Sequence, residues 1–137
     1  MNRNDLKALA RTRLREARAL LASGHYSGAY YLGGYVVECA LKACIAKETR
    51  RHDFPDKKRT LDSWQHSPLK LVDAARLRTL LEAERRADPR FAANWNVAED
   101  WTEESRYSQS DQRKAEALIR AISDKDHAVL KWLRRHW

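Results

Sequence analysis

Residues 26–47 read YSGAYYLGGYVVECALKACIAK, and this stretch decides the fold. It is apolar on nearly all sides of a helix, which is typical of a helix surrounded by others. We predict a helix from Ser27, a suitable N-cap, to about Lys47. Gly33-Gly34 would weaken such a helix by about 1 kcal/mol per glycine relative to alanine. We therefore expect a neighbouring segment or a ligand to approach the backbone closely at these two residues.

The flanking segments supply packing partners for this helix. From Asp5 to Ala22, apolar residues recur at i, i+3 and i+4, which predicts an amphipathic helix with basic side chains on its other face. Glu48 to Pro68 is charged and aperiodic, and is predicted to be a long exposed loop. The leucines that follow predict a third helix, broken near Ala75 and ending before Asp88-Pro89.

The last third of the chain is also expected to be helical. Between Arg90 and Tyr107 we expect a short helix and a loop whose aromatic residues belong to the core: Phe91, Trp95, Trp101 and Tyr107. Ser110-Asp111 is a cap for a further helix, and residues 123–126 start a final helical segment. Since no strand signal or repeat is present, the sequence predicts one all-α domain over residues 1–137.

The composition points to an anionic partner. The 137 residues include 27 Lys plus Arg and 19 Asp plus Glu, giving a net charge of +8. Such an excess attracts RNA, DNA, nucleotides or an acidic protein, although a merely solvated basic surface is the alternative. Cys39 and Cys44 are expected to be buried thiols, and we expect no metal site and no cofactor. With Glu38 and Lys42 in its apolar stretch and no leader-like N-terminus, the chain is predicted to be cytoplasmic and not to enter the membrane.

Several sequence segments resemble a known family. They are Gly24-His25-Tyr26, Ala29-Tyr30-Tyr31 and Gly34-Tyr35-Val36-Val37-Glu38-Cys39-Ala40-Leu41-Lys42-Ala43, then His66 before Pro68-Leu69-Lys70-Leu71, Asn94-Trp95, Trp101, Glu104-Ser105-Arg106-Tyr107 and Val129-Leu130-Lys131-Trp132. Together they resemble prokaryotic HEPN (higher eukaryotes and prokaryotes nucleotide-binding) proteins. The resemblance implies a four- or five-helix up-and-down bundle, usually a homodimer. It also implies either a ribonuclease or the partner of a minimal nucleotidyltransferase in a toxin–antitoxin or defence module.

The central helix contains two charges that demand an explanation. Glu38 and Lys42 lie at i, i+4 in the favourable order, but an exposed helical pair contributes only a few tenths of a kcal/mol. On an apolar helix such a pair needs further partners, such as Arg106, His66 or Tyr30. A structural polar network and a ligand cleft both remain open. The leading hypothesis is that nucleotide or RNA phosphate binds to the following residues: Glu38, Lys42, His66, Arg106 and Tyr107.

The alternative hypothesis is a metal-independent ribonuclease acting as a dimer. Catalytic HEPN proteins carry Arg, four to six residues, then His, a pair suited to general acid–base chemistry on RNA. Six residues separate Arg and His in three pairs: Arg18 and His25, Arg59 and His66, Arg120 and His127. Only Arg120 and His127 lie late in the chain as the family requires, but an apolar alanine follows Arg120. A third hypothesis is a non-catalytic scaffold whose basic face docks an acidic nucleotidyltransferase.

Overall fold

The structure is a computed structural model that describes residues 1–52 and 64–137, with the side chains of residues 50–52 left aside. Within these residues all regular structure is helical, which confirms the all-α prediction. The elements are α1 (Arg3–Ala22), α2 (Tyr26–His52), α4 (Pro68–Ala74), α5 (Arg78–Ala87), α6 (Pro89–Glu99), the 3-10 helix η1 (Glu103–Tyr107), α7 (Gln112–Ser123) and α8 (Val129–Arg134).

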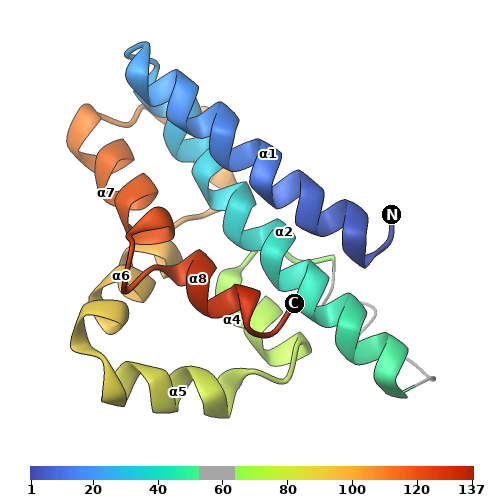
Figure 1. Ribbon diagram of the computed structural model, residues 1–137. Helices are drawn as coiled ribbons and strands as arrows, with labels where there is room; N and C mark the ends of the chain where they lie inside the picture. Colours follow the sequence, from blue (N-terminus) through green and yellow to red (C-terminus); the bar gives the residue numbers. More distant parts are fainter. Residues whose placement is uncertain (53–63) are drawn as a thin grey trace.

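Helix α2 is the centre of the domain. It packs along α1 and also contacts α4, η1, α7 and α8. Figure 1 shows α1 and α2 as a long antiparallel pair, with α4, α7 and α8 beside α2 and α5 farther away. None of the helices in the described part of the chain is long and apolar enough to cross a membrane. The central position of α2 is the reason why its sequence is apolar on nearly all sides.

The turn between α1 and α2 depends on one glycine. Gly24 adopts φ +80°, and the next amide, from His25, donates to the carbonyl of Leu20 at 2.8 Å. This left-handed residue ends α1 and reverses the chain, a conformation that glycine adopts at little cost. Helix α1 starts two residues before the predicted Asp5, because Asn2 and Asp5 form a reciprocal capping box.

The two glycines in the middle of α2 allow neighbouring side chains to reach its backbone. A Cβ atom on Gly34 would lie 1.9 Å from the Trp101 ring, and one on Gly33 would lie 3.1 Å from Leu118 and Ile119. The predicted close approach is therefore confirmed, and side chains of the same chain make it. The indole of Trp101 covers Gly34 and is itself 1% exposed.

Both ends of α2 differ from the prediction. The helix begins at Tyr26, so Ser27 is already helical, and its hydroxyl instead accepts a hydrogen bond from the amide of Ser110 at 2.9 Å. The helix continues past Lys47 to His52, so the predicted loop starts later than Glu48. Residues 53–63 of that loop lie outside the described residues, and Pro68, its predicted end, is the first residue of α4.

The predicted break in the third helix is confirmed. Helices α4 and α5 are separated at Arg76, which adopts φ +58°. Helix α5 ends at Ala87, and Asp88 caps α6 by accepting from the amides of Arg90 and Phe91 at 3.1 Å each. Aspartate followed by proline thus stops one helix and starts the next.

The aromatic residues that follow divide into two groups. Phe91, Trp95 and Trp101 are buried as predicted, at most 1% exposed. The prediction was wrong for Tyr107, which is 81% exposed. It is the last residue of η1, and its ring contacts the guanidinium of Arg106.

Candidate nucleotide-binding site

Glu38 is the buried centre of a polar cluster on α2. It is 4% exposed, and its Oε1 accepts a hydrogen bond from Lys42 Nζ at 2.8 Å, one helical turn away. The predicted ion pair is therefore present on the side of α2 that other elements cover. A buried carboxylate with a single cation is costly, since desolvation exceeds the attraction unless further hydrogen bonds form.

His66 provides the second contact to Glu38. Its Nδ1 lies 2.9 Å from Glu38 Oε1, and its Nε2 lies 3.1 Å from Glu103 Oε2. Carboxylates only accept hydrogen bonds, so both contacts are satisfied at once when both ring nitrogens carry a proton. The imidazole thereby joins α2 to η1. The next residue, Ser67, is the N-cap of α4, and its side chain accepts a hydrogen bond from the amide of Lys70.

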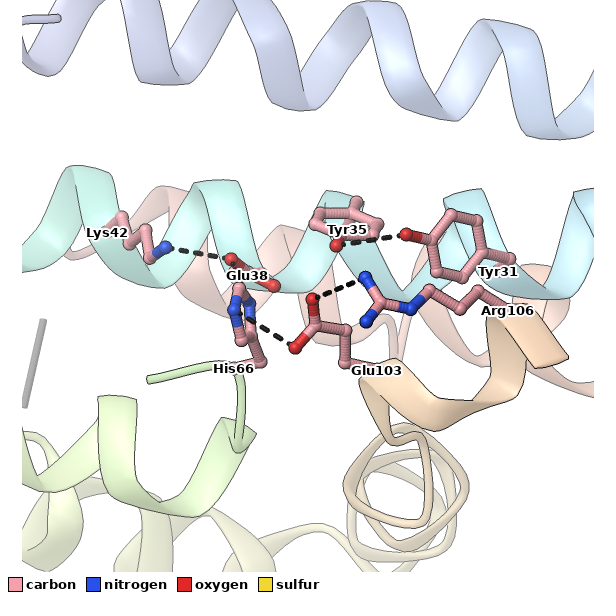
Figure 2. Close-up of polar contacts among 7 residues, drawn as sticks. All are labelled: Tyr31, Tyr35, Glu38, Lys42, His66, Glu103 and Arg106. Carbon is pink, nitrogen blue, oxygen red and sulfur yellow. Dashed lines mark hydrogen bonds and ion pairs between the residues drawn. The ribbon is translucent and has the colours of Figure 1, made fainter. Parts of the chain in front are cut away.

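Arg106 enters the cluster through Glu103. Its Nη1 donates to Glu103 Oε1 at 3.3 Å, and its guanidinium carbon lies 4.7 Å from the centroid of the Tyr107 ring. The pKa of Arg106 is raised, first by Tyr107 and then by Glu103. Figure 2 shows the chain of contacts from Lys42 through Glu38, His66 and Glu103 to Arg106. We call these five residues the Glu38 cluster.

Aromatic side chains form one wall of the Glu38 cluster. The hydroxyls of Tyr31 and Tyr35 are 3.2 Å apart, and the Tyr35 ring packs edge-on against both His66 and Trp101. Burial is the main cause that raises the pKa of Tyr35, and the hydrogen bond with Tyr31 and the charge of Glu38 add to it. The Tyr35 phenol therefore stays neutral at physiological pH and acts as a hydrogen-bonding group.

Two buried atoms beside this wall have no hydrogen-bond partner among the described residues. They are Oε2 of Glu38, an acceptor, and Nε1 of Trp101, a donor. Leaving such groups unpaired costs about 1–3 kcal/mol each, so native proteins usually satisfy them with water or a ligand. Lys42 and His66 both bind Oε1, which leaves Oε2 available.

Lys42 also borders an apolar groove. The groove has a volume of about 570 Å³ and is lined by Met1, Leu6, Lys42, Ile45, Ala46, Thr49 and Trp64. This volume lies within the usual range for small-ligand sites. Trp64 is 77% exposed and lines the same groove as Lys42. The sequence analysis missed Trp64, although a lone tryptophan in a charged, aperiodic segment was a signal for it.

The predicted catalytic pair, Arg120 and His127, is not part of the Glu38 cluster. His127 Nδ1 contacts Asp88 Oδ2 at 2.7 Å, and Asn94 donates to the His127 carbonyl at 2.9 Å. The hydrogen bond with His127 is the main cause that lowers the pKa of Asp88. Arg120 is exposed on α7, and among the described residues no hydrogen bond joins its side chain to His127. The catalytic role of the pair stays a prediction.

The structure does bring together the predicted binding residues. Glu38, Lys42, His66 and Arg106 belong to one hydrogen-bonded chain, with Glu103 as a link that the sequence analysis did not predict. Tyr30, the other predicted partner, instead packs under the ammonium of Lys114 at 4.7 Å. The three segments that meet here are α2, the residues before α4, and η1.

The fold and the Glu38 cluster define an all-helical domain with a charged network on its central helix. Comparison with protein families matches residues 4–136 to the HEPN domain, so the chain belongs to the HEPN domain family. This family membership confirms the resemblance seen in the sequence and associates the chain with nucleotide- and RNA-related functions. No curated protein and no solved structure matches the chain.

Proposed function

We propose that the chain binds a nucleotide, free or within RNA, at the Glu38 cluster. The observation that carries this proposal is the convergence of Glu38, Lys42, His66 and Arg106, with one buried carboxylate oxygen that has no partner among the described residues. A buried ion-pair network in contact with a groove is a reasonable place to look for a ligand.

The mixed charge of the cluster fits a nucleotide better than a bare phosphate. Lys42 and Arg106 are each paired with a carboxylate, so an incoming phosphate must compete with Glu38 and Glu103 for them. A nucleotide also carries hydroxyl and amino donors, which a free carboxylate oxygen accepts. The exposed ring of Trp64 or Tyr107 is suited to stacking on its base.

Binding of ATP and of a labelled single-stranded RNA tests this proposal. Lys42→Ala and Arg106→Ala should each lower the affinity for at least one of the two ligands by about tenfold, which is the effect of losing one charge-assisted hydrogen bond. Arg78→Ala is a matched control for Arg106→Ala, since Arg78 is 44% exposed against 45% and also pairs with a carboxylate, that of Asp73. Unchanged affinity in both cluster variants, with unchanged helical circular dichroism, would overturn the proposal.

We also propose the finer role that the resemblance implies. In that role the chain is a cytoplasmic homodimer and the partner of a minimal nucleotidyltransferase in a toxin–antitoxin or defence module. Support comes from the family membership and from the net charge of +8, which favours an acidic partner. Co-expression with a neighbouring nucleotidyltransferase gene tests it, and recovery of the two proteins separately would count against it.

A ribonuclease is a second candidate, favoured by one observation. The contact of 2.7 Å with Asp88 orients the imidazole of His127, as a general base requires. Under this candidate function the protein cleaves single-stranded RNA in EDTA, and His127→Ala abolishes the cleavage. Absence of cleavage by the parent protein, or its persistence in the variant, would refute the candidate.

A further inference from the structure

A second groove runs between α1, the end of α7 and α8. It has a volume of about 440 Å³ and shares no residue with the Glu38 cluster. Its lining consists of Leu14, Arg18, Ile122, Ser123, Asp124, Lys125, Ala128, Leu130, Lys131 and Arg134. We call it the basic groove, because four of these ten side chains are cationic and one is acidic.

The cations of the basic groove differ from those of the Glu38 cluster in having no acidic partner. Arg18, Lys125, Lys131 and Arg134 are all exposed, and among the described residues none of them lies within 4.0 Å of a carboxylate oxygen. The ammonium of Lys131 instead donates to the carbonyl of Lys125 at 3.3 Å. An anion that binds these four cations therefore need not break an existing ion pair, although the Asp124 carboxylate also lines the groove.

The floor of the basic groove offers little to a hydrophobic partner. Its apolar side chains are already buried by the fold, at 7% exposed for Leu14, 0% for Ile122, 4% for Ala128 and 3% for Leu130. An amphipathic acidic helix would thus gain little apolar burial here. The lining also has no aromatic ring on which a base could stack. What remains is a set of cations at the rim of a concave surface.

We propose that the basic groove binds the sugar–phosphate backbone of a single-stranded nucleic acid, without reading its bases. This inference deepens the proposed function, because it adds a backbone contact to the nucleotide contact at the Glu38 cluster. Lysine and arginine that neutralise phosphates release counterions from the nucleic acid. This release dominates the affinity of binding that depends on the backbone and not on the base sequence. Arg11 and Arg15, both exposed on α1, extend the positive charge along the same helix as Arg18.

The experiment compares two variants that each lose three positive charges. The groove variant is Lys125→Gln/Lys131→Gln/Arg134→Gln. The control variant is Lys70→Gln/Arg86→Gln/Arg90→Gln, whose residues are also exposed but lie on α4, α5 and α6. Fluorescence anisotropy with labelled oligouridylate and oligodeoxythymidylate of about 12 nucleotides, a usual site size, gives Kd over a range of salt concentrations.

We expect the groove variant to bind both oligonucleotides at least about tenfold more weakly at low salt. The slope of log Kd against log salt should fall by about 2, because each single-strand phosphate contact contributes about 0.7. The control variant should keep most of the affinity and slope. Equal losses in the two variants would overturn the proposal, since the binding would then follow net charge alone. Oligoglutamate that displaces the oligonucleotide as well as unlabelled oligouridylate does would also overturn it.

ATP binding separates this inference from the proposed function. The groove variant should bind ATP as the parent protein does, whereas Lys42→Ala should lower the salt slope of oligonucleotide binding by no more than one phosphate contact, about 0.7. If Lys42→Ala and Arg106→Ala bind ATP and the oligonucleotides as the parent does but the slope still falls in the groove variant alone, the proposed nucleotide site fails and the basic groove stands. If Lys42→Ala weakens ATP binding and the two triple variants have the same salt slope, the basic groove fails and the nucleotide site stands.

Discussion

Replacing Gly34 by alanine should destabilise the domain, although alanine is the better helix former. A Cβ at this position would lie 1.9 Å from Cε2, 2.1 Å from Cδ2 and 2.2 Å from Nε1 of Trp101. These atoms belong to a rigid ring that is 1% exposed, so the ring as a whole must move. The ring also packs against Tyr35, in the wall of the Glu38 cluster.

The two opposing effects have known sizes. Glycine to alanine inside a helix gains about 1 kcal/mol. Forcing an extra methyl group into a packed core costs about 1–3 kcal/mol, and the upper end applies here because the contact involves a ring and not a flexible chain end. The net loss should therefore be about 2 kcal/mol. For a chain of this size the corresponding fall in Tm is about 8 °C.

Urea unfolding of the parent, Gly34→Ala and Gly28→Ala checks this reasoning. Gly28 is the matched control, because a Cβ there would meet only the end of the Leu20 side chain, at 3.2 Å. That flexible end can yield, so Gly28→Ala should stay within about 1 kcal/mol of the parent or gain stability. If Gly34→Ala is as stable as Gly28→Ala, the inference that Trp101 packs closely against α2 at Gly34 is wrong.

Three further predictions concern buried or hydrogen-bonded groups. Glu38→Ala should lower the free energy of unfolding by about 2 kcal/mol, less than for a fully buried pair because its cationic partners are partly exposed; a loss below about 0.5 kcal/mol in urea unfolding would contradict its role as the network centre. Burial raises the pKa of the Cys44 thiol to about 12 and that of Cys39 to about 11, so a thiol reagent at about pH 8 should label both only after denaturation; rapid labelling of the native protein would refute this. The hydrogen bond with His127 lowers the pKa of Asp88 in the folded protein. The ionised Asp88 therefore stabilises the fold above the ordinary carboxylate pKa, and this stabilisation is lost as pH falls through the lowered pKa of Asp88 in the folded protein. The Tm difference between the parent and Asp88→Asn should therefore shrink below about pH 4, and a difference that widens on acidification would exclude that linkage.

Local patterns in the sequence determined most of the helices. Hydrophobic periodicity, the Asp88 cap and the break near Ala75 act over a few residues, so they are visible without the fold. The limits of α2 were predicted less well, because Ser27 had a partner 83 residues away that replaced its expected capping role. Tyr107 was predicted to be buried because its segment is rich in aromatic residues, yet it is exposed. The exposure of its side chain depends on how η1 packs against the other helices, which the local sequence does not show.

The Glu38 cluster shows what the sequence by itself determined and what only the tertiary structure decided. The ion pair of Glu38 and Lys42 follows from helical spacing, and its need for further partners follows from the cost of burying charge. Glu103, which joins His66 to Arg106, lies 65 residues from Glu38 in the sequence, and no local rule connects them. Only the packing of η1 and the segment before α4 against α2 places these charges within hydrogen-bonding distance, because burial and Coulomb attraction depend on separation in space and not along the chain.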